Sequence, residues 1–458
     1  MAPGSKPLLG ERGPNASLGE LAKQFFILGT TAFGGPAVHF AMYQARLVDD
    51  DAAGQQKWLS HERYMELFGM ASCLPGPSST QVAFAIGITQ QGVIGGLVAG
   101  FTFLLPGAIG MTIMGFLAHQ LEGQTEDVHS ITSGVAQACS CVGVALVFKA
   151  VTDLVLKCGK GPGAKTGTIC CLVAAACMLL HPAPPYLNPL LIFAGGLVTV
   201  LFPLQGTAAN KGLPPSGKVG LGFAAGIAIF VLYLLLTPLT LWLDAQKSPE
   251  GRPEVLVLGA NVGWLTAFLT AGMFVWGGGP VVLPMLAVAL VPSPGNPGFI
   301  SSTVFLAGIA FAEMMPGPVF NMSCFLGVQI ALKQGDIHWL LGTFLAWACL
   351  VGPGVTLTFG AMPLWEKLRS FAFYKKALPG LNAAAVGLLL STLFVVYQAL
   401  EDRAQAMHFV GGSRAIALGA YAVVAMQDRP RDDLVPLVVL VAGVLGAVWA
   451  SVPTGEEQ

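Results

Sequence analysis

The chain has 458 residues, of which 54% are hydrophobic and only 10% are charged, and its mean hydropathy is +0.70. Soluble globular domains carry roughly 25% charged residues, so this composition excludes that class and indicates an integral membrane protein. The formal net charge is -1 and the chain has no long basic run, which argues against a nucleic-acid partner.

The chain begins with a charged, proline-containing tail that lacks the apolar core of a cleavable signal. A segment of about 20 apolar residues can cross a bilayer, and by this measure we expect about thirteen transmembrane helices. They fall at residues 21–46, 63–89, 93–118, 131–151, 166–180, 188–204, 219–243, 258–291, 302–331, 337–360, 377–399, 412–426 and 434–451. The distribution of lysine and arginine favours an N-terminus inside the cell and a C-terminus outside. Most of the nine cysteines lie in apolar runs, which predicts core residues and no disulfide framework or metal site.

Three unusual motifs occur twice, in the same order. FFILGTTAFGGP from Phe25 recurs as FLTAGMFVWGGGP from Phe268, LPGP at 74–77 recurs as MPGP at 315–318, and LLPG at 104–107 recurs as VGPG at 351–354. The copies lie about 240 to 250 residues apart, which indicates an internal repeat. Ser60 and Ser301 stand in corresponding places before the PGP segments, and we expect both to cap helix N-termini.

The repeat divides the chain into two halves of about six helices each, joined by one further helix at residues 219–243. An odd number of crossings would bring the second half into the membrane from the opposite side. We therefore predict an all-α membrane protein with two inverted-topology repeats and broken helices at the GGP and PGP motifs, as in secondary transporters. This odd number holds only if the two short segments, residues 166–180 and 412–426, both cross the membrane. The expected divisions are a tail at 1–18, the first repeat at 19–205, a linking helix with loops at 206–255, the second repeat at 256–451 and a tail at 452–458.

The repeated motifs resemble the signatures of the chromate ion transporter family in its long, two-repeat form. The resemblance covers residues 20–450 and rests on FGGPAVHF, LPGPSSTQ, GGLVAGFTFLLPG, GGGPVVLP and PGPVFNMSCFLG. It implies two homologous halves, about thirteen helices and export of the chromate dianion, with a link to sulfate in some members. Such a dianion costs on the order of tens of kcal/mol to desolvate in a low-dielectric site, so the protein must supply hydrogen-bond donors.

The segment LPGPSSTQ would interrupt a membrane helix and make it polar. The break consists of Pro75, Gly76 and Pro77, and the first turn of the next helix consists of Ser78, Ser79, Thr80 and Gln81. A helix N-terminus offers unpaired N–H groups and about half a positive charge, so it could bind an anion within the membrane. The alternative is a proline kink whose hydroxyl groups bond back to carbonyls. The repetition of the motif favours the anion site.

The GGP motif is expected to act in the same way. Gly34 and Gly35 allow close approach of the backbone, and Pro36 can begin a helix. Counted from that start, His39, Tyr43 and Arg46 fall on one helix face and could line an anion path. An equal alternative is that Arg46 extends to the membrane surface and that His39 is a hydrogen-bonded core imidazole.

The second half repeats the breaks with different polar residues. The corresponding positions are Gly278, Gly279 and Pro280 for the first break, and Pro316, Gly317 and Pro318 for the second. Asn321 replaces Thr80, and Phe320 replaces Ser79. We therefore expect an asymmetric substrate site with most of its donors in the first half.

Glu313 is a carboxylate in the apolar run AGIAFAEMMPG. A charged side chain at the centre of a membrane helix costs about 2.5 to 3.5 kcal/mol, so such residues usually face a cavity or a partner. A nearby bound dianion would favour its protonated form. Our hypothesis is that Glu313 couples proton and anion movement, and the alternative is a structural hydrogen bond.

Together these features predict a secondary active transporter of a tetrahedral oxyanion, chromate or sulfate, that works by alternating access. The alternative is a passive anion channel built on the same broken helices. An enzyme is not expected, since the chain has no GxxxxGK[ST] or HExxH motif and its seven histidines are scattered, so we predict no cofactor and no metal. The expected partners are the oxyanion, protons, the lipid bilayer and a second copy of the chain as a homodimer. We expect the plasma membrane, with an organelle membrane as the alternative.

Overall fold

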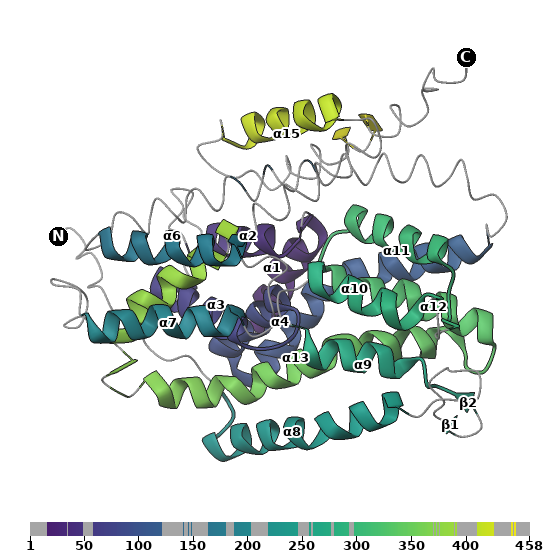
Figure 1. Ribbon diagram of the computed structural model, residues 1–458, viewed down its shortest axis with the longest axis horizontal. Coiled ribbons are helices and arrows are strands. Elements are labelled where there is room, and N and C mark those ends of the chain that lie inside the picture. Colours follow the sequence, from purple (N-terminus) through teal and green to yellow (C-terminus); the bar gives the residue numbers. More distant parts are fainter. Residues whose placement is uncertain are drawn as a thin grey trace, which may run out of the picture.

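The structure is a computed structural model of a largely helical protein (Figure 1). It describes residues 16–33, 35–48, 58–120, 164–179, 187–202, 219–245, 256–257, 260–275, 279–292, 297–369, most of 371–391 and 410–425, with a few single residues beside them. One short antiparallel strand pair, β1 (Leu256–Val257) and β2 (Ala260–Asn261), stands among the helices. The helices expected at 131–151 and 434–451 fall almost entirely outside the described residues.

The first half begins with the helices α1 (Leu18–Thr31), α2 (Pro36–Leu47), α3 (His61–Cys73) and α4 (Ser78–Gln120). The side chain of Ser60 accepts a hydrogen bond from the N–H group of Arg63 at the start of α3, and Ser301 accepts one from Val304 in the second half. The prediction that these two serines are helix caps is confirmed. Near its middle α4 reverses direction at Gly92, whose φ of 65° is a conformation that glycine adopts without strain.

The segments around the first two breaks are hairpins whose ends lie together. The N–H group of Trp58 donates to the carbonyl of Leu47 at 3.0 Å, and the Gln90 side chain donates to the carbonyl of Trp58 at 3.1 Å. Gln90 also accepts a hydrogen bond from the N–H group of Ala16 at 3.2 Å. The start of α1, the end of α2, the start of α3 and the turn in α4 therefore share one end of the molecule, which we call the Trp58 end.

These hairpins correct one expectation from the sequence. Residues 21–46 and 63–89 were each expected to cross the bilayer as a broken helix, and this is wrong because both segments turn back at the break. A helix of 12 to 14 residues is only about 18 to 21 Å long. Each arm is therefore shorter than the hydrocarbon core of about 30 Å, although the whole segment is long enough to cross.

The second half repeats the pattern of the first. Its elements are α9 (Leu265–Phe274), α10 (Gly279–Leu290), α11 (Ser302–Met314), the short 3₁₀ helix η2 (Val319–Asn321), α12 (Met322–Gln334) and α13 (Trp339–Arg369). Phe299 and Ile300 both donate N–H hydrogen bonds to the carbonyl of Leu290, at 2.7 and 3.2 Å. Trp58 and Leu59 make the same pair of bonds to Leu47 in the first half, so the two connections are built alike.

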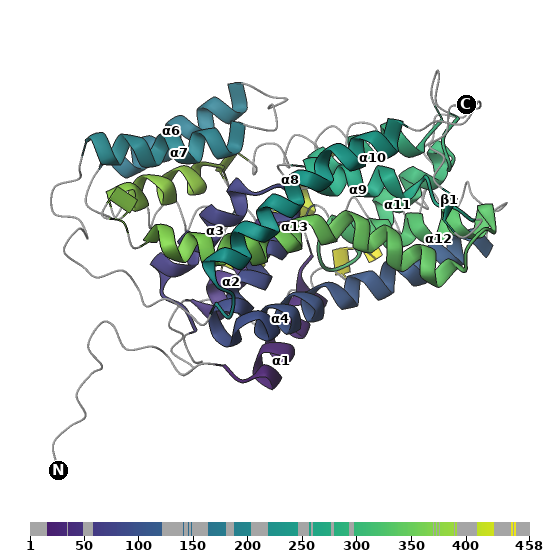
Figure 2. The same ribbon diagram turned by 90° about the horizontal axis from the view of Figure 1, so that it is seen from below.

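Two long helices connect the two ends of the molecule. Residues 93–120 of α4 run away from the Trp58 end until Phe116 packs against Trp339, with ring centroids 5.3 Å apart. We call this opposite end the Trp339 end. From there α13 runs back and finishes beside the start of α3, where Glu366 pairs with Arg63. Both helices follow the long axis of the molecule in Figure 2.

The linking helix α8 (Phe223–Ala245) also follows the long axis. Before it, Gly220 lies against Val93 at the Trp58 end, and after it β1, β2 and α9 follow at the far end in Figure 1. Among the described helices, three are long and apolar enough to cross a membrane, namely Ser78–Gln120, Phe223–Leu243 and Trp339–Arg369. On α8 the large apolar side chains are exposed, Leu234 by 65% and Leu235 by 66%, as expected of a surface that faces lipid.

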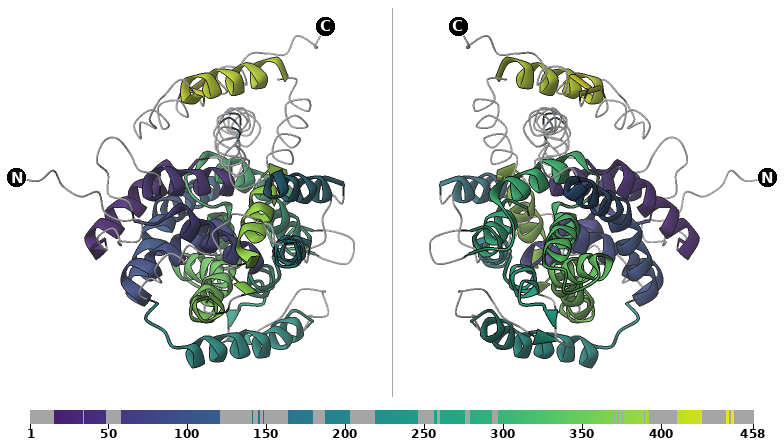
Figure 3. Two further views of the ribbon diagram at one scale, coloured as in Figure 1. Left: turned by 90° about the vertical axis from the view of Figure 1, so that its left-hand side faces the viewer. Right: turned by 90° about the vertical axis from the view of Figure 1, so that its right-hand side faces the viewer.

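The remaining helices lie around this framework. They include α6 (Ala164–Leu179), α7 (Leu187–Leu201) and α15 (Val410–Ala425), and residues 376–388 are helical as well. In Figure 3 α8 and α15 flank the other helices on opposite sides. One apolar core is formed mainly by α1 to α4 and a second mainly by α9 to α13, so each half has its own core.

Candidate functional site

The helix breaks of the two halves meet in the middle of the molecule. The N–H group of Gly76, in the first PGP motif, donates to the carbonyl of Val275 at the C-terminal end of α9, at 2.8 Å. The N–H group of Gly317, in the second PGP motif, donates to the carbonyl of Ala32 at the C-terminal end of α1, at 2.7 Å. Each half thus holds the helix break of the other by a backbone hydrogen bond, and the relation is reciprocal.

The third repeated motif supplies the surface on which each PGP break rests. A Cβ atom added at Gly354 would lie 2.9 Å from the Cα atom of Gly76. One added at Gly107 would lie 2.2 Å from the carbonyl oxygen of Pro316. Side chains do not fit at such distances, so the glycines of LLPG and VGPG are explained by close packing of the two backbones.

The first PGP break produces the helix start expected from the sequence. Helix α3 ends at Cys73, α4 begins at Ser78, and Gly76 between them has a φ of 120°. The N–H groups of the first turn of α4 are not used within the helix, and the positive end of its dipole lies at this break. An N-terminus of this kind, within the body of a membrane protein, is suited to an anion.

Two buried hydroxyl groups, one of them in the first turn of α4, lack a hydrogen-bond partner in the described part of the chain. Thr80 and Tyr43 are both fully enclosed, and neither hydroxyl oxygen has a hydrogen-bond partner among the described residues. Burying a hydroxyl group without a hydrogen bond costs about 1 to 3 kcal/mol in proteins. Each hydroxyl group therefore keeps a donor that the described residues do not use.

Gln81 has a different role from the one expected. Its amide nitrogen donates to the carbonyl of Pro75 at 2.9 Å and to that of Gly354, in the second half, at 3.0 Å. Both of its N–H donors are used in this way, and its amide oxygen, without a partner in the described part of the chain, can only accept. Gln81 therefore fixes the break against the second half and does not offer a donor to an anion.

His39 is enclosed by protein and joins three elements of the site. One ring nitrogen, Nε2, lies 3.2 Å from the carbonyl oxygen of Ala32, and the other, Nδ1, lies 3.0 Å from the hydroxyl oxygen of Ser79. A carbonyl can only accept, so Nε2 carries the proton and Nδ1 accepts from Ser79. Both nitrogens are used, which agrees with the core-imidazole alternative for this residue.

The remaining residues on that face of α2 diverge from the break. The Tyr43 ring packs between Phe25 and Phe103, with ring centroids 6.0 and 5.5 Å away. Arg46, in the last turn, is partly buried and donates to the side chain of Gln24 on α1 at 3.0 Å. The structure therefore leaves Tyr43 in the interior and places Arg46 toward the Trp58 end, so the two do not form one cluster.

The second PGP break lacks free polar groups of this kind at Asn321. The Asn321 side chain donates to the carbonyl of Leu104 at 3.2 Å and accepts from the indole N–H of Trp347 at 3.1 Å. The turn after this break is a 3₁₀ helix, and α12 begins only at Met322. The polar side chain is thus used to join the second break to α4 of the first half.

Some predicted site residues fall outside the described structure. Gly34 and Gly278 are not among the described residues. Gly279 and Pro280 begin α10, but their surroundings are not described. Glu313 occupies the last turn of α11, and its side chain lies outside the described part.

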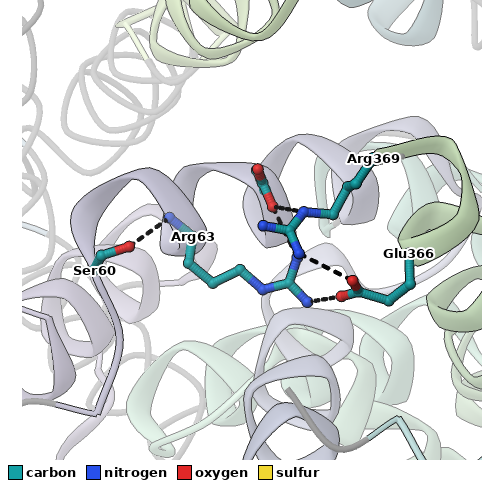
Figure 4. A network of polar contacts seen from close by, with 5 residues as sticks. Ser60, Arg63, Glu366 and Arg369 are labelled. Atoms are coloured by element: carbon teal, nitrogen blue, oxygen red, sulfur yellow. Dashed lines mark hydrogen bonds and ion pairs between the residues drawn. The ribbon is translucent and has the colours of Figure 1, made fainter. Parts of the chain in front are cut away.

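One group of residues was missed by the sequence analysis. Arg63 and Glu66 of α3 meet Glu366 and Arg369 of α13 at the Trp58 end (Figure 4). The signal was present as two arginine–glutamate pairs with i, i+3 spacing inside or beside apolar segments, where charges are costly. Their meeting depends on α13 returning to α3, which no local pattern reveals.

The membrane-crossing helices and the central broken helices define the class of an integral membrane transporter. A family model described as chromate transporter matches residues 19–200 and again residues 262–447. The chain belongs to the chromate transporter family. The family resemblance noted in the sequence is thereby confirmed.

Two relatives match this chain over nearly their whole length, and a third matches it over most of its length. A chromate transport protein of Pseudomonas aeruginosa is 25% identical over 445 residues, which cover 96% of this chain and 94% of the relative. A probable chromate transport protein of Synechococcus elongatus is 23% identical over 448 residues, with 96% and 97% covered. A chromate transport protein of Cupriavidus metallidurans is 24% identical over 383 residues, with 84% and 83% covered. No solved structure is significantly similar to the chain.

Proposed function

We propose that this protein is a secondary active transporter of a tetrahedral oxyanion dianion, chromate or the similarly shaped sulfate, and that the substrate binds at the first PGP break. The observation that carries the proposal is the reciprocal pair of hydrogen bonds, Gly76 to Val275 and Gly317 to Ala32, which joins the PGP break of each half to a helix end of the other half. The family membership and the chromate transport activity named for the relatives support the choice of substrate class.

The two halves are proposed to work as inverted repeats with alternating access. The hairpins of the first half open at the Trp58 end, and the linking helix α8 leads away from that end before the second half begins. Halves that enter from opposite ends and meet at broken helices are typical of secondary transporters. Rocking of one half against the other would expose the central site to each side in turn.

The substrate is proposed to bind by hydrogen bonds from the first half. The N-terminus of α4 supplies backbone N–H groups around Ser78, and the buried hydroxyl group of Thr80 can donate. These groups compensate part of the cost of desolvating a dianion without a fixed positive charge, so release stays feasible. His39 and Gln81 support the site by fixing the positions of Ser79 and of the break.

The Trp58 end is proposed to face the cytoplasm, and the plasma membrane is the proposed location. The beginning of α1, the basic residues Arg46 and Arg63 and the end of α13 with Lys367 all belong to this end. Lysine and arginine near the ends of membrane segments gather on the cytoplasmic side. The hairpin geometry thus supports the N-terminus-inside orientation on grounds different from a count of crossings.

The main test is transport by the purified protein in liposomes. Radiolabelled chromate and sulfate uptake should saturate with substrate concentration and respond to an imposed pH gradient. Flux of neither anion would contradict the proposed function. A passive channel would instead show a reversal potential set by the anion gradient alone and no saturation at moderate concentration.

Proton coupling is proposed to involve Glu313. A carboxyl group in the last turn of α11 directly precedes the second PGP break, close along the chain to the central site. Glu313→Gln should abolish the dependence of flux on the pH gradient, because the amide cannot release a proton. Unchanged pH dependence in this variant would exclude the role.

A further inference from the structure

Four charged side chains form a closed network at the Trp58 end (Figure 4). Within α3 Arg63 pairs with Glu66 at 2.8 Å, and within the end of α13 Arg369 pairs with Glu366 at 2.9 Å. Between the two helices Arg369 pairs with Glu66 at 2.8 Å, and Arg63 pairs with Glu366. We call these four residues the charge quartet. It joins the first half to the second.

The charge quartet is enclosed by protein. The exposed fractions of its side chains are 3% for Arg63, 0% for Glu66, 15% for Glu366 and 5% for Arg369. Among the described residues, the arginine and glutamate side chains that are buried all belong to it. Burial of ion pairs gains little stability compared with apolar side chains of the same volume, so stability alone is a weak reason for these charges.

The opposite end of the molecule has no equivalent network in the described residues. Val304 and Ala307 take the places of Arg63 and Glu66 when the capping serines Ser60 and Ser301 are aligned. There the end of α4 contacts the second half through the rings of Phe116 and Trp339. Two halves that are alike in backbone thus close their two ends differently, with charges at one end and aromatic rings at the other.

The charge quartet is arranged so that it can separate without stranding a charge. Each helix contributes one arginine and one glutamate three residues apart, and each of these pairs is in contact within its own helix. If α3 and α13 moved apart, each would retain a neutral pair. Separation would therefore break only the two contacts between the helices, which avoids the large penalty of an uncompensated buried charge.

The described residues leave room for a side chain on α3 between the charge quartet and the central break. Helices α3 and α13 touch at the break, where Gly76 meets Gly354, and again at the quartet, about 15 to 18 Å further along each helix. Between them Gly69 is buried, yet a Cβ atom added there would meet no atom within 4 Å among the described residues. Glu66, Gly69 and Cys73 share one face of α3 and lead from the quartet to the break.

We propose that the charge quartet is a gate that closes the path from the central site to the Trp58 end, and that it opens by separating into two neutral pairs. This proposal rests on the proposed function, because a gate at one end is meaningful for alternating access. In the structure the gate is closed. At the Trp339 end α4 meets α13 through the rings of Phe116 and Trp339, so the two ends would open with different energy costs.

The experiment uses a cysteine in place of Gly69 as a reporter of access. Gly69→Cys has room for its side chain, and the nine native cysteines are first replaced by alanine or serine. The purified protein is reconstituted in liposomes without substrate, and the rate of reaction with a small, membrane-impermeant thiol reagent is measured. This reading does not depend on transport, so it remains valid if the proposed substrate class is wrong.

Two variants should change the rate of the thiol reaction in opposite directions. Arg63→Gln with Glu66→Gln removes both contacts between the helices and leaves the neutral pair of Glu366 and Arg369 within α13, so no charge is unpaired, and we expect the thiol to react about tenfold faster. Arg63→Glu with Glu366→Arg keeps both contacts between the helices but makes each internal pair one of like charges. Opening then leaves repelling charges on each helix, so we expect about tenfold slower reaction and a similar loss of flux.

The matched control reverses all four charges. The combination of Arg63→Glu, Glu66→Arg, Glu366→Arg and Arg369→Glu restores every pair with opposite sign, so reporter rate and flux should return toward those of the starting protein. Reporter rates within about twofold of each other in all folded variants would overturn the gate. If the double variants fail to fold while the fourfold variant folds, the fourfold variant is compared with an uncharged one that combines Arg63→Met, Glu66→Leu, Glu366→Leu and Arg369→Met. Equal thiol reaction rates in these two proteins would also overturn the gate. A starting protein that shows gated access but no oxyanion flux would contradict the proposed function alone.

Discussion

The first and second PGP breaks have the same backbone but different surroundings. Gly76 and Gly317 both have positive φ angles, 120° and 96°, and both donate an N–H hydrogen bond to the opposite half. After the first break α4 begins at once and buries a hydroxyl group, that of Thr80, without a partner in the described residues. After the second break the Asn321 side chain donates to the carbonyl of Leu104 and accepts from the indole N–H of Trp347. The comparison teaches that the backbone symmetry assembles the centre, while the side chains make its two sides chemically different.

The largest effect should come from crowding the first break. Gly76→Ala forces a residue with a side chain into a φ of 120° and places its Cβ atom 2.7 Å from the Cα atom of Gly354. We expect a loss of about 3 kcal/mol in the free energy of unfolding. Gly317→Ala should lose only about 1 to 2 kcal/mol, because its nearest contact is a movable side-chain atom of Asn321 at 3.3 Å.

Thermal unfolding of the detergent-solubilised protein measures both losses. Gly352→Ala is the matched control, because a Cβ atom there would meet no atom within 4 Å in the described structure. It should unfold at the temperature of the unmodified chain or slightly above it. Equal losses for Gly76→Ala and Gly317→Ala would show that the two breaks are equally tight.

A smaller loss of stability should follow from Asn321→Leu. This change leaves the indole N–H of Trp347 without its acceptor and the carbonyl of Leu104 without its donor. We expect a loss of about 2 kcal/mol in the free energy of unfolding, because buried polar groups without partners are costly. Oxyanion flux per folded molecule should change little. A fall in flux with unchanged stability would instead place Asn321 among the substrate-binding residues.

For Thr80→Val we expect a loss of oxyanion flux without a loss of stability. The valine side chain has nearly the same shape, and the lost hydroxyl group has no partner in the described part of the protein, so stability should be unchanged or slightly higher. Flux at low oxyanion concentration should fall about tenfold, since a hydrogen bond to a charged group is worth about 1.5 to 3 kcal/mol. Ser323→Ala serves as the control, because its hydroxyl group bonds back to the carbonyl of Phe320. Normal flux in Thr80→Val would remove Thr80 from the substrate site.

The smallest effects are expected at the helix caps, where the two halves should behave alike. Ser60→Ala and Ser301→Ala each remove one hydrogen bond to the first turn of a helix, at 3.2 and 3.3 Å. Each should lower the free energy of unfolding by about 1 kcal/mol. Ser302→Ala, at an exposed position beside the cap, is the control. A much larger loss at Ser60 would mean that the cap also supports the charge quartet.

Local sequence was sufficient for the features that depend on a few neighbouring residues. The helix caps at Ser60 and Ser301 and the breaks at the PGP motifs follow from side-chain and proline chemistry within one turn. The family followed from the repeated motifs. The linking helix at residues 219–243 was long and apolar enough to be recognised directly.

The return of each hairpin could not be predicted from hydropathy. A segment such as 21–46 has the length of a crossing helix, and length does not reveal whether the chain continues or reverses at a glycine-rich break. The contact between Gly76 and Val275 joins residues of different halves, so no local pattern contains it. The same holds for the use of Gln81, whose donors are taken by Pro75 and Gly354.

The carbonyl oxygen of Ala32 has two donors, Gly317 from the other half and His39 from its own. If Gly317 withdraws, this oxygen keeps one hydrogen bond. The carbonyl of Val275 has no histidine as a second donor, because Val282 and Leu283 of α10 stand in the region that corresponds to His39. Since a carbonyl left bare in a membrane interior is costly, the bond to Ala32 is the cheaper of the two to break. Separation of the halves should therefore have a preferred order, in which the second PGP break is released before the first.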